Sequence, residues 1–248
     1  MMRRRVWGGV FAILAIALTC VVFAPAAWLS DFVAARSRVR LIYPSGTLWD
    51  GSAILAIYDG RSARALPGRL AWDVRWMELV HGQLVVMVNH ASLEDAIRIG
   101  YDGRAVYLEG GRALWPAAML EILGAPFNTI SPGGLLLVRW GDSRLTKSGF
   151  RGGFQVDWSN AQSALSPVVP LGDFRIVVNL DEREGSATLV TLKGPLLLNG
   201  EGRMERGHVR FSGTADAEPA MRARLNGLIG VLGPRSGEKV LLKWDYRT

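Results

Sequence analysis

An uncharged apolar run from Val6 to Leu29 constrains the fold of this chain more than any other feature. A helix rises about 1.5 Å per residue, so a run of this length crosses a hydrocarbon core of about 30 Å. Arg3, Arg4 and Arg5 precede the run, and a positive cluster at the short end of a span stays in the cytoplasm. The pattern predicts one transmembrane helix, with the chain after it outside the cytoplasm.

This prediction divides the chain into a cytoplasmic stub at residues 1–5, a transmembrane anchor at 6–29, a juxtamembrane segment at 30–45 and a β-rich domain at 46–248. An alternative stays open, because Ala24-Pro25-Ala26 resembles the small-x-small site at which signal peptidase cuts, and cleavage after Ala26 would release the domain. The apolar region of a signal peptide usually has about 7 to 15 residues. This run is longer than that before Pro25, which favours an uncleaved anchor.

The net charge argues against a nucleic-acid partner. Residues 1–40 carry six Arg and one Asp, which contribute +5 of the formal +7 and leave +2 for the rest of the chain. No later segment concentrates Lys and Arg with interleaved aromatic residues, as a nucleic-acid groove requires.

The only cysteine, Cys20, lies inside the apolar run. A domain after Leu29 therefore has no thiol and folds without disulfide bonds. With about 200 residues after the run and half of the whole chain apolar, one core or two small ones can be buried.

Short segments rich in Val, Ile, Leu and aromatic residues, separated by Gly, Pro, Asn and Asp, predict antiparallel meander sheets. In the first part of the domain these segments are 52–58, 68–76, 83–91, 96–101 and 105–109. In the second part they are 134–140, 154–158, 174–180, 187–192, 195–199 and 208–214. The predicted fold class is mainly β.

Two short helices interrupt the strand pattern. Residues 114–123 place apolar side chains along one broad face, and Pro116 suits a first helical turn. Residues 221–232 carry Leu and Ile at helical spacing, and Gly233-Pro234 ends the run.

The domain reads as two similar halves, 46–124 and 133–233. Each half opens with a Gly-rich turn before a Trp-bearing strand and closes with a helix that ends in Leu-Gly. The alternative is that any meander with Gly turns looks self-similar, and the drifting offsets leave both interpretations open.

No residue set predicts catalysis, and we expect no catalytic, cofactor-binding or metal-binding residues. His81, His90 and His208 stand singly, without a second His or Cys at metal-ligand spacing. Ser236-Gly237-Glu238-Lys239 matches a Ser-x-x-Lys motif, but the residues after it are too few for the partner motifs of penicillin-binding enzymes. Gly200-Glu201-Gly202 is better explained as a hairpin turn than as part of a phosphate loop.

The tryptophans are the one compositional excess. Six of them are predicted on strands, where we expect most to fill the core: Trp49, Trp72, Trp76, Trp140, Trp158 and Trp244. The alternative is that they line an apolar groove for a lipid or for a strand of a partner.

Several segments, in order from the anchor almost to the C-terminus, together resemble the family of type II secretion system protein N, also called general secretion pathway protein N. The first are Gly46-Thr47-Leu48-Trp49-Asp50-Gly51-Ser52-Ala53, Leu66-Pro67-Gly68-Arg69-Leu70-Ala71-Trp72 and Trp115-Pro116-Ala117, with Leu123-Gly124 after it. The later ones are Trp158-Ser159-Asn160-Ala161, Pro170-Leu171-Gly172, Gly194-Pro195-Leu196-Leu197-Leu198-Asn199-Gly200 and Leu232-Gly233.

The resemblance implies an accessory inner-membrane component of the machine that exports folded proteins, with its domain in the periplasm and other secretion components as partners. The resemblance carries no catalytic residues.

We consider two functions as hypotheses. The first is a scaffold or interaction module that docks neighbours by strand addition. The second is a membrane-anchored carrier or sensor of lipid or another apolar ligand.

Overall fold

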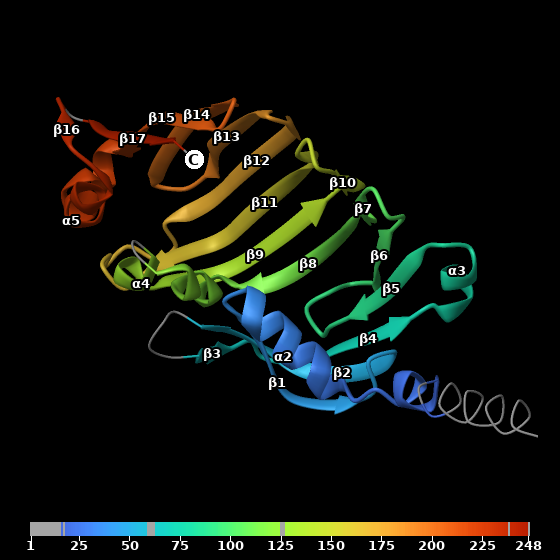
Figure 1. The fold of residues 1–248 in the computed structure, drawn as a ribbon. Coiled ribbons are helices and arrows are strands. Elements are labelled where there is room, and N and C mark those ends of the chain that lie inside the picture. Colours follow the sequence, from blue (N-terminus) through green and yellow to red (C-terminus); the bar gives the residue numbers. More distant parts are fainter. Residues whose placement is uncertain (1–15, 17, 59–62, 125–126, 238, 248) are drawn as a thin grey trace, which may run out of the picture. The chain divides into compact units, whose positions relative to one another are not determined.

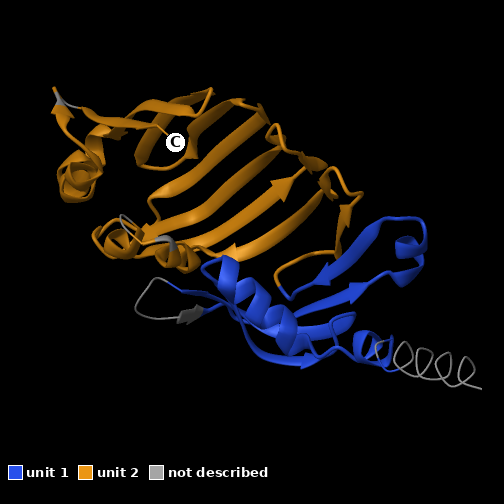
Figure 2. Ribbon diagram, in the orientation of Figure 1, with its two compact units in different colours: residues 1–91 blue, residues 92–248 orange. Residues whose placement is uncertain are grey.

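A computed structural model describes residues 16, 18–58, 63–124, 127–237 and 239–247 (Figure 1). The chain is mainly β and forms two compact units, residues 1–91 and 92–248 (Figure 2). The boundary falls after Ala91, inside the first of the two predicted halves.

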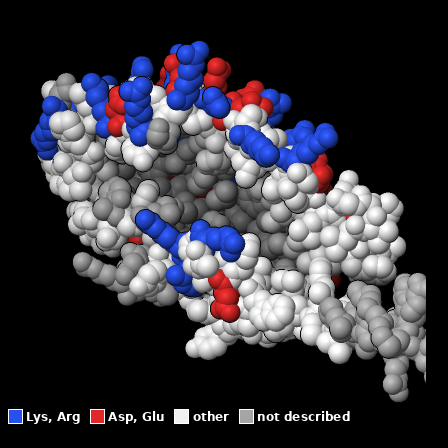
Figure 3. Space-filling view, viewed as in Figure 1, with Lys and Arg blue, Asp and Glu red and all other residues white. Residues whose placement is uncertain are grey.

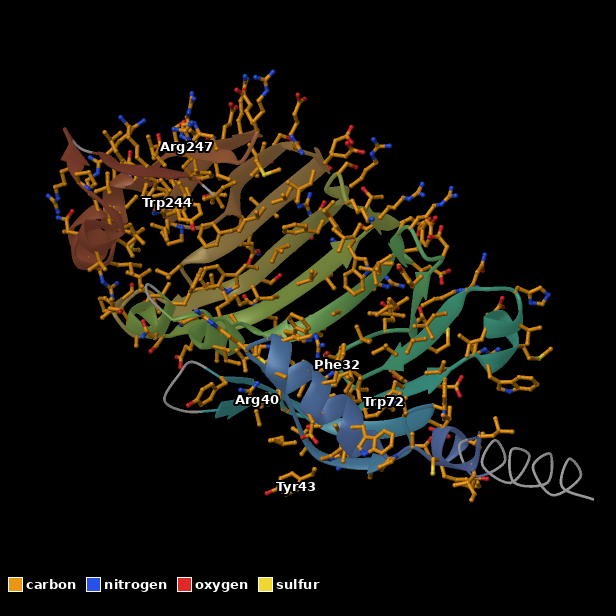
Figure 4. The ribbon with its side chains drawn as sticks, viewed as in Figure 1. Phe32, Arg40, Tyr43, Trp72, Trp244 and Arg247 are labelled. Carbon is orange, nitrogen blue, oxygen red and sulfur yellow. The ribbon has the colours of Figure 1, made fainter. Side chains whose placement is uncertain are left out.

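Unit 1 is a small antiparallel sheet with one helix packed on it. Its elements are α2 (Ala26–Arg36), β1 (Val39–Gly46), β2 (Asp50–Tyr58), β3 (Ala63–Ala65), β4 (Leu70–Val74), α3 (Trp76–Val80) and β5 (Leu84–Asn89). The strand β2 pairs with β1 on one side and with β3 and β4 on the other, and β4 pairs with β5. The core forms where α2 meets the sheet, around Ala26, Leu41, Ala53 and Trp72 (Figure 4).

Close approach of Trp72 to β2 explains why position 51 is glycine. A Cβ atom on Gly51 would lie 2.6 Å from Cζ2 of Trp72, closer than any real side-chain contact. The Trp72 indole occupies the space that a side chain at position 51 would fill. Trp72 is 5% exposed, and its indole donates the Nε1–H to the Leu48 carbonyl at 3.1 Å.

Unit 2 is a larger antiparallel sheet. Its first elements are β6 (Ile97–Tyr101), β7 (Val106–Leu108), β8 (Gly111–Pro116), η1 (Ala117–Leu123), α4 (Phe127–Ile130), β9 (Pro132–Trp140), β10 (Ser143–Leu145) and β11 (Phe150–Ser163). The later ones are β12 (Gly172–Glu182), β13 (Glu184–Lys193), β14 (Leu196–Glu205), β15 (His208–Ala217), η2 (Pro219–Met221), α5 (Arg222–Leu232), β16 (Arg235–Ser236) and β17 (Lys239–Arg247).

Eight strands of unit 2 lie in the order β8, β9, β11, β12, β13, β14, β15, β17, each antiparallel to its neighbours. The core lies at one end of this sheet, under α5. Leu225, Leu228 and Ile229 of that helix are buried against the sheet. The helix predicted at 221–232 is thus confirmed, because its apolar spacing matches the face that it buries.

The helix predicted at 114–123 is wrong in its first part. Residues 111–116 form β8, paired along its length with β9, and only Ala117–Leu123 is helical, as a 3-10 helix. Pro116 has an extended backbone with ψ of 135°, so the helix cannot begin before Ala117. The pairing that residues 111–116 make with β9 outweighs the local helical pattern of these residues.

The hairpin turn predicted at Gly200-Glu201-Gly202 is also wrong. These residues lie in the middle of β14, and Gly200 pairs with Leu189 and Gly213. The reason is packing, because a Cβ atom on Gly200 would lie 2.3 Å from the Phe211 ring. The turn comes later, at Arg206 and Gly207, whose φ angles of 49° and 81° suit a tight hairpin.

Two of the six tryptophans predicted on strands lie elsewhere. Trp49 is in the turn before β2, and Trp76 begins α3. Trp76 and Trp244 are also 68% and 57% exposed rather than buried, whereas Trp72 fills the unit 1 core and Trp158 packs on the unit 2 core.

The predicted anchor lies partly outside the described residues, which omit 1–15 and 17. Residues 26–29 of that prediction belong to α2, and most of the predicted segment 30–45 forms the rest of α2 and β1. Within the part of the chain that the structure describes, no helix has the length and apolar character to cross a membrane.

Candidate interaction surfaces

Side-chain alternation gives the unit 2 sheet two different faces. One register row across eight strands is mostly apolar: Gly111, Trp140, Phe154, Val178, Ala187, Gly202, Phe211 and Trp244. The adjacent row is mostly polar: Arg112, Arg139, Gln155, Val177, Thr188, Glu201, Ser212 and Lys243. Because successive side chains point to opposite sides, these rows mark an apolar face and a polar face.

Among the described residues of unit 2, α5 covers one end of the apolar face. There α5 packs on Phe174, Leu196 and Leu242. Farther along the strands, Phe154 and Ile176 are each 37% exposed. Figure 3 shows few charged side chains over this part of the sheet, and charged groups gathered along its hairpin ends. The face therefore presents apolar surface beyond what the core uses.

A charge cluster joins three strands on the polar face. Asp157 of β11 is 9% exposed. Its carboxylate accepts hydrogen bonds from Arg175 on β12 at 2.6 Å, from Arg139 on β9 at 2.6 Å and from Gln155 at 3.0 Å. The Arg175 guanidinium, helped by Arg139 and Gln155, lowers the pKa of Asp157 to about 2, against the effect of burial. These groups satisfy one another's hydrogen-bonding capacity within the sheet. The role of the cluster is therefore structural, since it links β9, β11 and β12.

The strand β17 ends the sheet with an open edge. The N–H of Leu241 points away from β15 and donates to the Pro234 carbonyl at 2.9 Å. Backbone groups alternate along a strand, so the N–H groups of Lys243, Asp245 and Arg247 point the same way. In the described ranges, no strand pairs with this side of β17 after Leu241. Three residues thus present donors and acceptors that another strand could use.

The open edge has distinct chemistry on its two faces (Figure 4). On the apolar face, Trp244 and Tyr246 are 57% and 66% exposed. The Trp244 ring contacts that of Phe211 in a tilted arrangement, with ring centroids 5.0 Å apart. On the polar face, Asp245 lies 2.5 Å from Nε2 of His208. Lys243 and Arg247 form no ion pair within the described part of the chain.

The polar side of this edge borders a groove of about 470 Å³. Among its lining residues are Glu201, Arg203, Glu205, His208, Arg210 and Lys243. The histidines predicted to stand singly are distributed over both units. His208 contacts Asp245, while His81 follows α3 and His90 follows β5.

The open edge and the Asp157 cluster are the features that sequence reasoning missed. The sequence does contain a pattern that indicates a half-buried strand here, since Leu242-Lys243-Trp244-Asp245-Tyr246-Arg247 alternates apolar and charged residues. The cluster had none, because its charges come together only through the register of three strands.

The fold thus defines the chain as a mainly β protein with a two-faced antiparallel sheet and an open edge strand. The chain is a member of the family of type II secretion system protein N, because the model of that family matches residues 37–242. The match runs from just before β1 to Leu242, the fourth residue of β17, and confirms the resemblance seen in the sequence. No curated protein and no solved structure matches the chain. Membership associates the chain with type II secretion and its components.

Proposed function

We propose that this chain is a non-enzymatic accessory component of the type II secretion machinery and acts as an interaction module. In this proposal the part of the apolar run that precedes α2 anchors the chain in the bacterial inner membrane, with the N-terminus in the cytoplasm and both units in the periplasm. Residues 26–29 of the predicted anchor lie instead in α2, where Ala26 belongs to the unit 1 core. The observation that carries the proposal is the open edge of β17.

Strand addition is the docking mode that this edge favours. A partner strand would pair with the backbone groups of Lys243, Asp245 and Arg247. Its apolar side chains would cover Trp244 and Tyr246, and its other side would face Lys243 and Arg247. The partner strand therefore alternates apolar residues with polar residues that include carboxylates.

The edge of β1 is less suited to this role. Pro44 lies in it and has no N–H to donate. The pairing with β2 is also irregular between Ile42 and Ser45. Proline and bulges are devices that block pairing at sheet edges, so we assign docking to β17.

A proline at position 243 is expected to reduce capture of the partner about tenfold or more, as the loss of a backbone hydrogen bond of about 1.4 kcal/mol would. The change removes an N–H that points outward, so the ladder with β15 stays intact. The measurement is photo-crosslinking in native membranes from a reactive residue at Tyr246, in full-length Lys243→Pro and unchanged chains.

The matched control is Lys243→Ala, which removes the charge but keeps the N–H and should retain most of the capture. Equal capture by the proline and alanine variants would reject strand addition at this edge. Failure of the unchanged chain to capture any secretion component above background would reject the interaction module.

The exposed apolar face supports a second function, that of a carrier or sensor of lipid or another apolar ligand. Phe154 and Ile176 could contact acyl chains there. Under this hypothesis, mass spectrometry of the purified full chain finds co-purifying lipid, and added lipid quenches Trp fluorescence. The absence of both results would reject it.

A further inference from the structure

The short helix α3 leaves three apolar side chains mostly exposed. Trp76, Met77 and Val80 are 68%, 65% and 78% exposed. Positions 76, 77 and 80 lie on one side of a helix, while Glu78 lies on the other and is half-buried. An exposed apolar group of this kind marks a contact with another molecule or with a membrane.

Two hydrogen bonds of Trp49 bring α3 and the part of the apolar run around Val21 to the same end of unit 1. The indole of Trp49 donates its Nε1–H to the Val21 carbonyl at 2.8 Å. The carbonyl of the same Trp49 accepts a hydrogen bond from the N–H of Val74 at 2.6 Å. Val74 ends β4, and α3 begins two residues later (Figure 1). The apolar run around Val21 and the start of α3 are thus both tied to Trp49.

The residues of the run that lie at this end of unit 1 are themselves exposed. Val21, Val22 and Phe23 are 52%, 49% and 70% exposed. The run before them is uncharged from Val6 onward, as an occupant of the hydrocarbon core would be. A bilayer reached by this run therefore lies at the end of unit 1 that carries α3.

The composition of α3 and its flanks matches the membrane interface. Trp is enriched at that depth, because its ring is apolar and its N–H is polar. Arg75 precedes the helix and His81 follows it, so polar groups could stay in the headgroup region while Trp76 and Val80 enter the acyl boundary.

We propose that α3 rests on the periplasmic surface of the inner membrane and gives unit 1 a second lipid contact beside its anchor. A helix of five residues has little apolar area to bind by itself. The anchor holds it close to the bilayer, so its contact becomes intramolecular and is favoured by a high effective concentration. The two contacts together would fix the orientation of unit 1. This inference rests on the anchor of the proposed function.

The test places an environment-sensitive NBD label on Val80→Cys in a full-length Cys20→Ser chain. The labelled protein is reconstituted in vesicles of phosphatidylethanolamine and phosphatidylglycerol. The matched control is Ala65→Cys, which is also exposed in unit 1. Ala65 pairs with Ala56, about 20 Å along β2 from Asp50, which follows Trp49.

We expect the emission at residue 80 to rise severalfold on reconstitution, with strong quenching by doxyl lipids and protection from aqueous iodide. The label at residue 65 should behave in the opposite way. Iodide access at residue 80 equal to that at residue 65 would overturn the inference. Protection from both quenchers would also overturn it, since α3 would then be covered by protein.

A third label, on the natural Cys20 of the otherwise unchanged chain, separates this inference from the proposed anchor. Lipid quenching at residue 20 without lipid quenching at residue 80 would leave the anchor standing and reject the role of α3. Lipid quenching at neither position would reject both. Lipid quenching at residue 80 without it at residue 20 would support the contact of α3 and reject the anchor.

Discussion

Replacing Phe174 with Ala is expected to lower the free energy of unfolding of unit 2 by about 3–5 kcal/mol, the usual cost of a large cavity in a core. Phe174 is 2% exposed and is one of the largest fully buried side chains. Its ring lies 5.8 Å from that of Trp158, and it belongs to the cluster that α5 covers. Loss of the ring would leave a void between the sheet and the helix.

The measurement is urea unfolding of the full chain in detergent, followed by hydrogen exchange of peptides from β12 and α5. Ile176→Ala is the matched control, because it lies on the same strand and face but is 37% exposed. It should cost about 1 kcal/mol. If Phe174→Ala cost no more than Ile176→Ala, α5 would not close the core as described.

Replacing Asp157 with Asn is expected to cost about 2 kcal/mol at neutral pH. The carboxylate is lost while Arg139 and Arg175 stay close together, so both guanidinium groups lose their counter-ion. The folded pKa of Asp157 is about 2, below its ordinary value of 3.8. A difference of this size corresponds to about 2 kcal/mol of stability.

The pH dependence of this effect has a definite sign. The folded state binds the proton of Asp157 less readily than the unfolded state does. Its contribution is therefore fully present above about pH 4 and is lost as the pH falls toward 2. The gap in urea midpoint between the wild type and Asp157→Asn should close over this range. The control is Asp181→Asn, whose carboxylate pairs with Arg151 at the surface and is 69% exposed. A gap that stays constant with pH would contradict the assigned role.

Elements with a strong local period were predictable from the sequence. The pattern around Phe174 predicted a strand, and β12 contains it. The spacing of Leu225, Leu228 and Ile229 predicted α5. Both succeed because each pattern reports one face buried against a neighbour, which is a property of local residue order.

Elements stabilised mainly by their neighbours were not predictable in the same way. Leu114 has a helical local pattern but lies in β8, since pairing with β9 decides its conformation. Gly200 resembles a turn residue but lies in β14, because the Phe211 ring needs the space that a side chain would fill. The exposure of Trp76 also has no local signal that separates it from the buried Trp72.

The amino-acid sequence by itself determined the apolar run, the mainly β class, most strand segments and the family, because each depends on residue types in a local order. The tertiary structure alone decided which face of the unit 2 sheet stays uncovered, which edge stays open, and which distant charges meet at Asp157. Those features depend on strand register and on which elements cover one another, and both arise from contacts between residues far apart in the chain.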